Sequence, residues 1–380
     1  MARVLFTSCP AFGHVLPMLP LIRAAERCGH DVRIATGPDL LEPLADRGLD
    51  VRPIGPTFED SWSAHEAVWA DPRLPEEQKM MDGVVALFGT PALARLADLV
   101  TMTQEWRPDI IVHEVLESAG SLLARRLEVP AVVHGIGPMF PLYAQLIAPA
   151  GAAIGEPQLW TQAASERALD ICPPSLQPDD GPPPWPGATP LRPSAGEPGQ
   201  VPPRVAEVIA AEGQVAYFTL GTVSNTDNAD FQTGLTALGE YDGIVIATTG
   251  RRVDPDELGP LPPNAIVAEF VPQDAVLERA DLLVSHSGSG TMLGGLVHGV
   301  PQVALPRGTD QPQNAALLER AGAGVVVGPE EFAVETIHTA VRQVTENPSF
   351  RSAAERLRDE IADMPDADAV WTRIAGEVIA

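Results

Sequence analysis

Short apolar segments alternate with helical segments in both halves of the chain, and this alternation constrains the fold more than any other feature. Strands that alternate with helices form a parallel sheet with helices on both faces. We therefore expect a doubly wound α/β sheet in the first half. Its predicted strands are Val4–Thr7, Asp31–Ala35, Val51–Ile54, Asp109–Val115 and Ala131–His134, and its predicted helices are Pro17–Cys28, Leu40–Arg47, Pro91–Trp106 and Ser118–Leu127.

The second half repeats the pattern after a proline-rich segment. Residues 173–203 hold twelve of the 39 prolines, which excludes a helix and indicates an extended link between two domains. We expect domains at 1–203 and 204–380, and the last helix can pack back on the first domain. The predicted strands here are Val215–Leu220, Ile244–Thr248, Ile266–Glu269, Leu282–His286, Gln302–Leu305 and Val325–Val327, and the predicted helices are Asp230–Leu238, Asp274–Arg279, Thr291–His298 and Gln313–Ala321, with long helices closing the chain.

The composition narrows the classes of function. A net charge of −26 argues against a general affinity for nucleic acid or anionic membranes, although a local group of backbone N–H donors can still bind a diphosphate. The three cysteines, Cys9, Cys28 and Cys172, form no Cys-x-x-Cys pair, so we expect neither a disulfide framework nor a cysteine zinc site. No Asp-x-Asp motif lies at a strand end, and no metal is expected. We see no signal-like run and no membrane-length apolar stretch, which favours a cytoplasmic protein.

The segment from Leu282 to Thr291 has the features of an anion-binding site. An apolar strand runs into His286, a flexible loop of small residues follows at Ser287–Gly290, and Thr291 is expected to open a helix. Small residues let the backbone approach a ligand closely, and the N-terminus of a helix favours negative charge. This segment therefore predicts a phosphate cradle, to which His286 and Thr291 add side-chain donors.

A nicotinamide-binding site does not fit the same residues. Its fingerprint needs Gly-x-Gly-x-x-Gly after a strand and an acidic residue about 20 positions later. Only Gly13 follows the first strand, and the second strand ends in Ala35-Thr36 without an acid. In the second half, the third glycine position is occupied by Leu293. A dehydrogenase is therefore excluded on the pattern.

Four segments together resemble a known family. They are the start of the chain from Arg3 through Gly13-His14 to Pro17, the Glu-Phe-Val-Pro-Gln run from Glu269, the cradle itself, and the Gly-Thr-Asp-Gln-Pro-Gln-Asn-Ala run from Gly308. These segments resemble nucleotide-sugar-dependent glycosyltransferases of the GT-B fold, and most of all the bacterial branch that modifies macrolide, polyketide and enediyne natural products. The resemblance covers nearly the whole chain. It implies two Rossmann-like domains that face each other across a cleft, with the acceptor bound by the first and the donor by the second.

The resemblance also implies how the acceptor is activated. His14 is the general base of an inverting, metal-independent transfer, a role that suits a neutral imidazole near pH 7. Glu114, at the end of a predicted strand, orients and stabilises that imidazole. Judged on the residues alone, His14 can instead cap a helix and Glu114 can be an ordinary loop acid. His113 alternates to the opposite face of the strand and is assigned a structural role.

On the donor side, the resemblance assigns roles residue by residue. Phe270 stacks on the nucleobase, Val271 offers backbone bonds to its edge, and Asp310 and Gln311 hold sugar hydroxyls. The diphosphate contacts are Thr222, His286, Gly288, Ser289, Gly290 and Thr291. Core packing remains an alternative for Phe270, and a solvated loop remains one for Asp310 and Gln311.

One departure from the family pattern concerns the donor. Relatives that use uridine nucleotides commonly carry a glutamate eight positions after the histidine, where it binds both ribose hydroxyls, and here that position is Gly294. A 2′-hydroxyl buried without a partner would cost about 1–3 kcal/mol. The departure therefore favours a TDP-deoxysugar as co-substrate, and no further cofactor is expected. The alternative is a UDP-sugar transferase of small phenolic aglycones.

The acceptor is expected to be an apolar, polyketide-like aglycone. Six side chains from two stretches expected to be irregular suit such a ring system, and they suit a protein core equally well. They are Trp62, Trp69, Phe88, Met139, Phe140 and Tyr143. A catalytically silent activator of a partner transferase, carbon rather than oxygen attack, and a homodimer all remain open.

Overall fold

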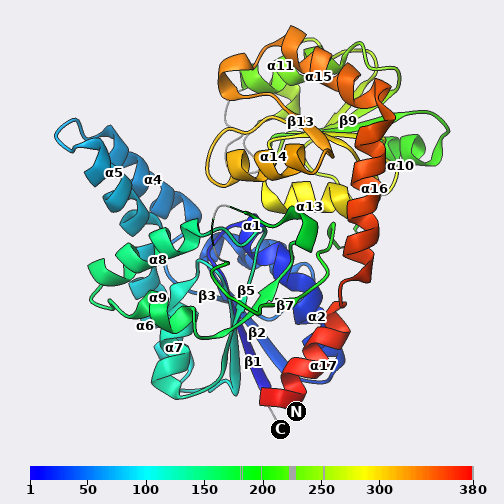
Figure 1. Cartoon of the computed structure of the whole chain (residues 1–380). Helices are drawn as coiled ribbons and strands as arrows, with labels where there is room; N and C mark the ends of the chain where they lie inside the picture. The colour runs from blue at the N-terminus through cyan, green and yellow to red at the C-terminus, as the bar shows by residue number, and fades with distance from the viewer. Residues whose placement is uncertain (180, 182, 198, 222–227, 251–252, 379–380) are drawn as a thin grey trace. The chain divides into compact units, whose positions relative to one another are not determined.

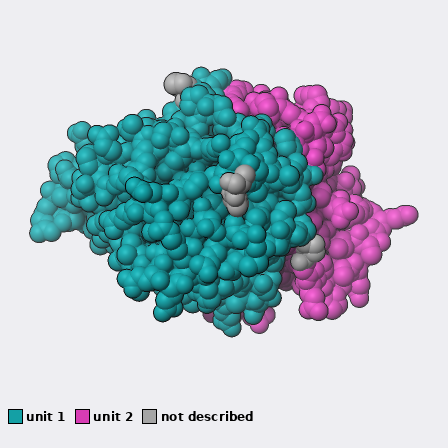
Figure 2. Space-filling view, turned by 90° about the horizontal axis from the view of Figure 1, so that it is seen from below, with its two compact units in different colours: residues 1–171, 178–191, 365–380 teal, residues 172–177, 192–364 magenta. Residues whose placement is uncertain are grey.

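The computed structural model describes residues 1–179, 181, 183–197, 199–221, 228–250 and 253–378. The chain forms two compact units (Figures 1 and 2). Unit 1 comprises residues 1–171, 178–191 and 365–380, and unit 2 comprises residues 172–177 and 192–364.

Unit 1 is built on a seven-stranded sheet in the order β3-β2-β1-β4-β5-β6-β7, in which every pairing is parallel. The strands are β1 (Arg3–Thr7), β2 (Asp31–Thr36), β3 (Val51–Pro53), β4 (Ile110–Glu114), β5 (Ala131–His134), β6 (Arg167–Asp170) and β7 (Thr189–Pro190). The helices are α1 (Phe12–Val15), α2 (Leu19–Arg27), α3 (Leu41–Ala45), α4 (Phe58–Ala70), α5 (Glu76–Val84), α6 (Thr90–Met102), α7 (Ser118–Leu127), α8 (Leu142–Ala153), α9 (Leu159–Ala163) and α17 (Ala367–Val378).

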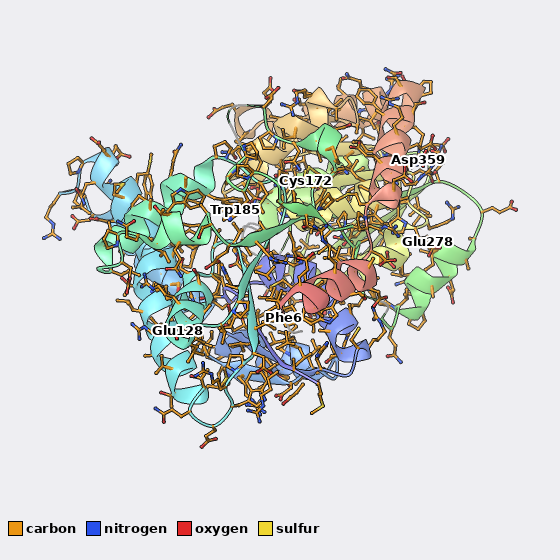
Figure 3. All side chains as sticks on the ribbon, turned by 60° about the horizontal axis from the view of Figure 1, so that its bottom comes forward. Phe6, Glu128, Cys172, Trp185, Glu278 and Asp359 are labelled. Atoms are coloured by element: carbon orange, nitrogen blue, oxygen red, sulfur yellow. The ribbon has the colours of Figure 1, made fainter. Side chains whose placement is uncertain are left out.

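The central strand β1 shows why this sheet is covered on both faces. Val4, Leu5 and Phe6 are all fully buried, although successive side chains of a strand point to opposite faces. Leu5 belongs to the main core of unit 1, whereas Phe6 lies 6.3 Å from the ring of Trp371 in α17 (centroid to centroid). Figure 3 shows Phe6 beside this terminal helix. The continuous apolar run predicts a strand buried on both faces, as found in parallel sheets.

The two units do not divide the chain at residue 203, the boundary expected from the sequence. The proline-rich segment is shared: residues 178–191, which include the edge strand β7, belong to unit 1, whereas residues 192–203 belong to unit 2. The final helix α17 belongs to unit 1, where it contacts α2. Because Trp371 needs the apolar surface around Phe6, the end of the chain is part of the first unit's core.

Most of residues 58–89 is helical, so the expectation of an irregular stretch around Trp62, Trp69 and Phe88 was wrong. Helix α4 begins with a capping box, in which the Thr57 hydroxyl accepts from the Asp60 N–H (3.1 Å) and the Asp60 carboxylate accepts from the Thr57 N–H (3.2 Å). This Thr-x-x-Asp signal is present in the sequence. Helices α4 and α5 contact each other and appear as a hairpin at one side of unit 1 in Figure 1.

One stretch of unit 1 has the length and composition of a membrane span, contrary to the sequence expectation. It runs over Glu76–Met102, across α5, a π turn and α6, and part of it is buried. In α6, Leu96 and Leu99 lie in the core and Arg95 is buried in a polar network. Core helices of soluble proteins can have the same length and apolar composition, so this stretch is weak evidence for a membrane span.

Unit 2 is built on a six-stranded parallel sheet in the order β10-β9-β8-β11-β12-β13. In β8, Val215 and Tyr217 belong to one apolar cluster while Ala216 and Phe218 belong to another, so helices cover both faces of the sheet. The strands are β8 (Val215–Thr219), β9 (Ile244–Thr248), β10 (Ala265–Ala268), β11 (Leu282–Ser285), β12 (Gln302–Ala304) and β13 (Gly324–Val326). The helices are α10 (Pro203–Ala210), α11 (Asn228–Leu238), α12 (Gln273–Leu277), α13 (Ser289–Val297), α14 (Gln311–Arg320), α15 (Val334–Glu346) and α16 (Pro348–Asp363).

Helices α13 and α14, which carry predicted site residues, begin earlier than predicted. Helix α13 begins at Ser289 with Gly288 as its N-cap, so the predicted loop loses two residues to the helix and Gly290 and Thr291 lie in its first turn. Helix α14 begins at Gln311 with Asp310 as its N-cap, rather than at Gln313. Glycine, serine and proline suggest loops in the sequence, but the first turn of a helix tolerates them because its N–H groups lack helical partners anyway.

Candidate active site

The strand order locates one candidate site in each unit. In doubly wound sheets, ligands bind outside the carboxyl ends of the strands where the order reverses. That reversal lies between β1 and β4 in unit 1 and between β8 and β11 in unit 2. His14 follows β1 and Glu114 ends β4, whereas His286 follows β11. The predicted catalytic and phosphate-binding residues therefore lie at the two switch points.

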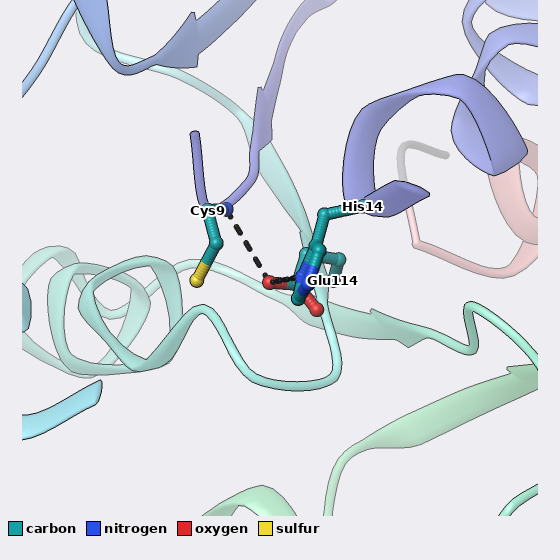
Figure 4. A group of neighbouring side chains, drawn as sticks. All are labelled: Cys9, His14 and Glu114. Carbon is teal, nitrogen blue, oxygen red and sulfur yellow. Dashed lines mark hydrogen bonds and ion pairs between the residues drawn. The ribbon is translucent and has the colours of Figure 1, made fainter. Parts of the chain in front are cut away.

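The structure brings His14 and Glu114 together. His14 Nδ1 lies 2.9 Å from Glu114 Oε1, and their side chains are 21% and 0% exposed (Figure 4). Glu114 also accepts hydrogen bonds from the backbone N–H of Cys9 (3.3 Å) and of Leu116 (2.7 Å). A buried carboxylate with these donors is rigidly held, and it presents one oxygen to the imidazole.

The charge of Glu114 settles the tautomer of His14. Burial alone would raise the pKa of Glu114, but the charge and hydrogen bond of His14, with the donors from Leu116 and Cys9, outweigh burial and lower that pKa to about 2. An ionised carboxylate only accepts hydrogen bonds. His14 Nδ1 must therefore carry the proton, which leaves Nε2 as the basic nitrogen when the ring is neutral. This is the arrangement that a general base requires.

A second buried acid, Glu117, was missed by the sequence analysis. Its carboxylate caps helix α7 by accepting from the N–H groups of Ala119 (3.0 Å) and Gly120 (2.8 Å), and it accepts from Thr7 Oγ1 (2.6 Å) at the end of β1. Arg95 of α6 neutralises it through Nε at 3.0 Å, with both side chains at most 1% exposed. The sequence does contain a signal for it, because Glu117 follows the candidate acid Glu114 by only three positions.

His113 has a different partner from its neighbour Glu114, as its opposite orientation predicts. Its Nε2 lies 2.7 Å from Glu166 Oε2, and Glu166 Oε1 accepts from Ser121 Oγ (2.6 Å). Burial alone would lower the pKa of His113, but the charge and hydrogen bond of Glu166 raise it to about 9. His113 is therefore a cation at neutral pH and is unsuited to act as a base.

The N-terminus of α13 carries the features of the predicted phosphate cradle in unit 2. His286 lies against Gly288, where an added Cβ would come within 2.5 Å of the imidazole Nε2. No described atom lies within 4 Å of a Cβ added at Gly290. Burial lowers the pKa of His286 to about 4, despite the opposing charge of Asp310, so the imidazole is neutral at pH 7.

Asp310 and Gln311 belong to an ordered polar network and not to a solvated loop. Asp310 Oδ2 accepts from Ser289 Oγ (2.7 Å) and from Asn314 Nδ2 (2.8 Å). Gln311 is 4% exposed, and its Oε1 accepts from the backbone N–H of Arg307 (2.8 Å). Asn314 is fully buried and also donates to the carbonyl of Ser287 (3.1 Å), so it ties α14 to the cradle. Asn314 was not among the site residues predicted from the sequence.

The predicted base-binding residues lie just after β10. Phe270 is 63% exposed, which excludes core packing as its role within unit 2, whereas the neighbouring Val271 is 2% exposed. Thr222, the remaining predicted diphosphate contact, lies outside the described residues.

Gly294 lies on the buried side of α13. A Cβ added there would lie 2.6 Å from Gln273 Nε2, 3.3 Å from Leu277 Cδ1 and 3.5 Å from Ala195 Cα. The place of the family's ribose-binding glutamate is therefore taken in part by the amide of Gln273, which donates to the carbonyl of Ala195 (3.4 Å).

The six candidate acceptor side chains separate into two groups. Met139, Phe140 and Tyr143 are 2%, 6% and 6% exposed, and the first and last of them belong to the main core of unit 1. Trp62 and Trp69 lie on α4, where Trp69 is 40% exposed, and Phe88 is partly buried in the π turn. The α4 side chains remain available to a ligand, whereas the core explains Met139 and Tyr143.

Comparisons with known proteins show the family of this chain. Residues 23–186 match the N-terminal domain, and residues 232–376 the C-terminal domain, of the erythromycin biosynthesis protein CIII-like family. The L-demethylnoviosyl transferase of Streptomyces niveus is 31% identical, and the match covers 99% of this chain and 98% of that protein. The elloramycin glycosyltransferase ElmGT of Streptomyces olivaceus is 30% identical, and the match covers 98% of this chain and 96% of that protein.

Solved structures extend the agreement to the fold. The spinosyn rhamnosyltransferase SpnG in complex with thymidine diphosphate has a TM-score of 0.80 and 25% identity, and the match covers 98% of this chain and 100% of that one. The Streptomyces glycosyltransferase SsfS6 in complex with thymidine diphosphate has a TM-score of 0.79 at 25% identity, with 99% and 100% covered. The predicted fold of two Rossmann-like domains is confirmed. This chain belongs to the erythromycin biosynthesis protein CIII-like family, the natural-product branch of the GT-B glycosyltransferases.

Proposed function

We propose that this glycosyltransferase moves a deoxysugar from a TDP-sugar to a polyketide-like aglycone with inversion at the anomeric carbon. The observation that carries the proposal is the pairing of His14 with the buried, ionised Glu114 at the switch point of unit 1. A partly exposed imidazole with its basic nitrogen directed away from a fixed carboxylate suits the deprotonation of an acceptor hydroxyl.

In the proposed reaction, His14 Nε2 removes the proton of the acceptor while the acceptor oxygen attacks the anomeric carbon. The bond from that carbon to the diphosphate breaks, and the proton remains on the imidazole. Glu114 stabilises the imidazolium through Nδ1, where the two groups already lie 2.9 Å apart. The charge that the base gains is thus compensated without a change of geometry.

The donor site of the proposal is the cradle of unit 2. Backbone N–H groups of Ser289, Gly290 and Thr291 have no helical partners at the start of α13, and the helix dipole favours the leaving diphosphate there. Neutral His286 adds a hydrogen-bond donor without a charge. These donors are backbone and imidazole N–H groups, and on that basis we propose a transfer that does not depend on a metal ion. We also propose that the enzyme acts in the cytoplasm.

The choice of TDP rests on Gly294, which supplies no carboxylate for a ribose diol. Relatives of this chain support that choice. SpnG and SsfS6 have both been solved with thymidine diphosphate, and one relative is named the aclacinomycin-T 2-deoxy-L-fucose transferase of Streptomyces galilaeus.

The decisive experiment is the turnover of purified enzyme in which His14 is replaced by alanine. We expect His14→Ala to lower kcat by roughly 10²–10⁴ while the affinity for TDP stays nearly unchanged, because general-base catalysis contributes about that much and the imidazole belongs to unit 1. A matched control is His338→Ala, since His338 lies on α15, away from both candidate sites. Near wild-type turnover by His14→Ala would contradict the assignment, and a wild-type protein that binds TDP but glycosylates no aglycone would favour the silent activator.

A further inference from the structure

We propose that Cys9, His14 and Glu114 form a binding site for a zinc-type divalent cation, and that an ion bound there inhibits glycosyl transfer. The binding half of the proposal stands on its own, whereas the inhibition rests on the proposed role of His14 as the base.

The three residues offer ligand atoms from three separate elements. Cys9 lies in the loop after β1, His14 in α1 and Glu114 at the end of β4, and their ligand atoms all lie within 4.8 Å of one another (Figure 4). His14 follows Cys9 by five positions and Glu114 follows His14 by 100 positions, which is no recognisable metal-ligand spacing. The sequence predicted no cysteine-containing metal site because it contains no spacing pattern that would reveal this cluster.

The charges around the cluster favour a cation. Glu114 and Glu117 are both fully buried acids, but the one buried guanidinium among the described residues nearby, that of Arg95, is paired with Glu117 at 3.0 Å. The ion pair formed by Glu114 is with His14, which carries a charge only when protonated. Two buried carboxylates therefore stand against one buried guanidinium around the cluster, and buried charges are costly unless they are paired.

The ligand types select the metal. A thiolate, an imidazole and a carboxylate are the set that Zn²⁺ and Co²⁺ prefer, whereas Mg²⁺ and Ca²⁺ prefer oxygen ligands throughout. Three protein ligands leave a fourth position of a tetrahedral ion open to water. His14 is 21% exposed at its side chain, which gives the ion a path to the cluster.

The binding reaction removes the base. The Cys9 thiol loses its proton to solvent and its sulfur binds the metal, while one ring nitrogen of His14 gives its lone pair to the ion. The imidazole proton then resides on the other nitrogen, so neither nitrogen can accept a proton from an acceptor hydroxyl. No electron is transferred in this step.

The test uses Co²⁺ as a spectroscopic probe, because a thiolate ligand gives a near-ultraviolet charge-transfer band that water and carboxylates do not. We expect the band in the wild-type protein and in a Cys28→Ser/Cys172→Ser variant, in which Cys9 is the only cysteine. We expect Cys9→Ser to lose the band. Zn²⁺ should displace Co²⁺ and bleach the band, and Mg²⁺ should not. Cys28 is the matched control, because it is exposed and far from the other two ligands in the fold.

Loss of the band in the Cys9-only variant would overturn the proposal, and this variant answers the question even if Cys9→Ser fails to fold. A band that Cys9→Ser retains would assign the metal to Cys28 or Cys172 and would also overturn it. Turnover is measured separately: Zn²⁺ should inhibit the wild type and the Cys9-only variant. If the band is present without inhibition, the metal site stands and the role of His14 as the base fails.

Discussion

At the scale of single residues, unit 1 places its buried charges at the carboxyl ends of strands and pairs each one locally. Glu114 pairs with His14, Glu117 with Arg95, and His113 with Glu166. A buried charge without a partner costs several kcal/mol, so each pair must form as the sheet forms. The pairs also give the adjacent residues His113 and Glu114 opposite charges, because Glu166 holds His113 protonated, whereas the charge and hydrogen bond of His14 hold Glu114 ionised.

The His113–Glu166 pair predicts a pH dependence of stability. The pKa of His113 is raised from 6.5 to about 9 in the folded state, so its contribution is fully present below pH 6.5 and is lost as the pH rises through about 9. One pKa unit corresponds to about 1.4 kcal/mol, which makes the largest contribution roughly 3 kcal/mol. Urea denaturation followed by tryptophan fluorescence measures it, because all six tryptophans lie in unit 1.

We expect the wild type to be more stable than His113→Gln at pH 6 and to lose most of this advantage by about pH 10. Glu166→Gln should remove the same pH-dependent difference, since it removes the partner charge. An advantage of equal size at both pH values would show that His113 stabilises the unit by packing and not by its charge.

At the scale of elements, the start of α13 combines the predicted anion site with the contacts that shape it. Asp310, the N-cap of α14, accepts from Ser289 in the first turn of α13, and Asn314 of α14 holds the carbonyl before that helix. Hydrogen bonds therefore join α13 and α14 around the cradle. The positive φ of Ser287 (62°) is an uncommon conformation for a residue other than glycine, and it turns the chain from β11 into the cradle.

Gly290 allows a clean test of the cradle. A Cβ at this position meets no described atom within 4 Å, so Gly290→Ala should leave the fold intact and should not lower the melting temperature. If the diphosphate lies against this turn, the added methyl should weaken TDP binding by about 1–3 kcal/mol, roughly 5- to 150-fold. Calorimetry with TDP measures the change. Gly376→Ala in α17 has equally open space and should change neither property. Unchanged TDP affinity in Gly290→Ala would place the diphosphate elsewhere.

At the scale of the whole molecule, the family match covers both domains. The preference between TDP and UDP is therefore tested on the full-length protein. We expect TDP to bind at least as tightly as UDP in side-by-side calorimetric titrations of the wild type, because position 294 has no carboxylate that could accept a hydrogen bond from a 2′-hydroxyl. A clear preference for UDP would contradict the argument and would favour the transfer from UDP-sugars to phenolic aglycones.

The substitution Gly294→Glu is a weaker test than those titrations. Its side chain would collide with the amide end of Gln273 and would lie close to the backbone of Ala195. A gain in UDP affinity is therefore interpretable only when Gln273→Ala is made in the same protein and the double variant melts like the wild type.

The sequence by itself determined most strands and helices of the two sheets, and it predicted the phosphate cradle and pointed to His14. These features are local: apolar runs define buried strands, and a strand that runs into small residues and a helix defines an anion site, so each can be read within about ten residues. The pairing of His14 with Glu114 could also be predicted, because the carboxyl ends of parallel strands share one edge of a sheet.

Only the tertiary structure decided which distant polar groups meet. The Arg95–Glu117 pair, the clamp of Asn314 on the cradle, and the cluster of Cys9 with His14 and Glu114 join residues without any periodic relation. The same holds for α17, which ends the chain and yet fills the core of unit 1 through Trp371. Burial creates these contacts: a polar or aromatic group taken out of water must find its partner in space, and nothing in the local pattern states where that partner stands in the chain.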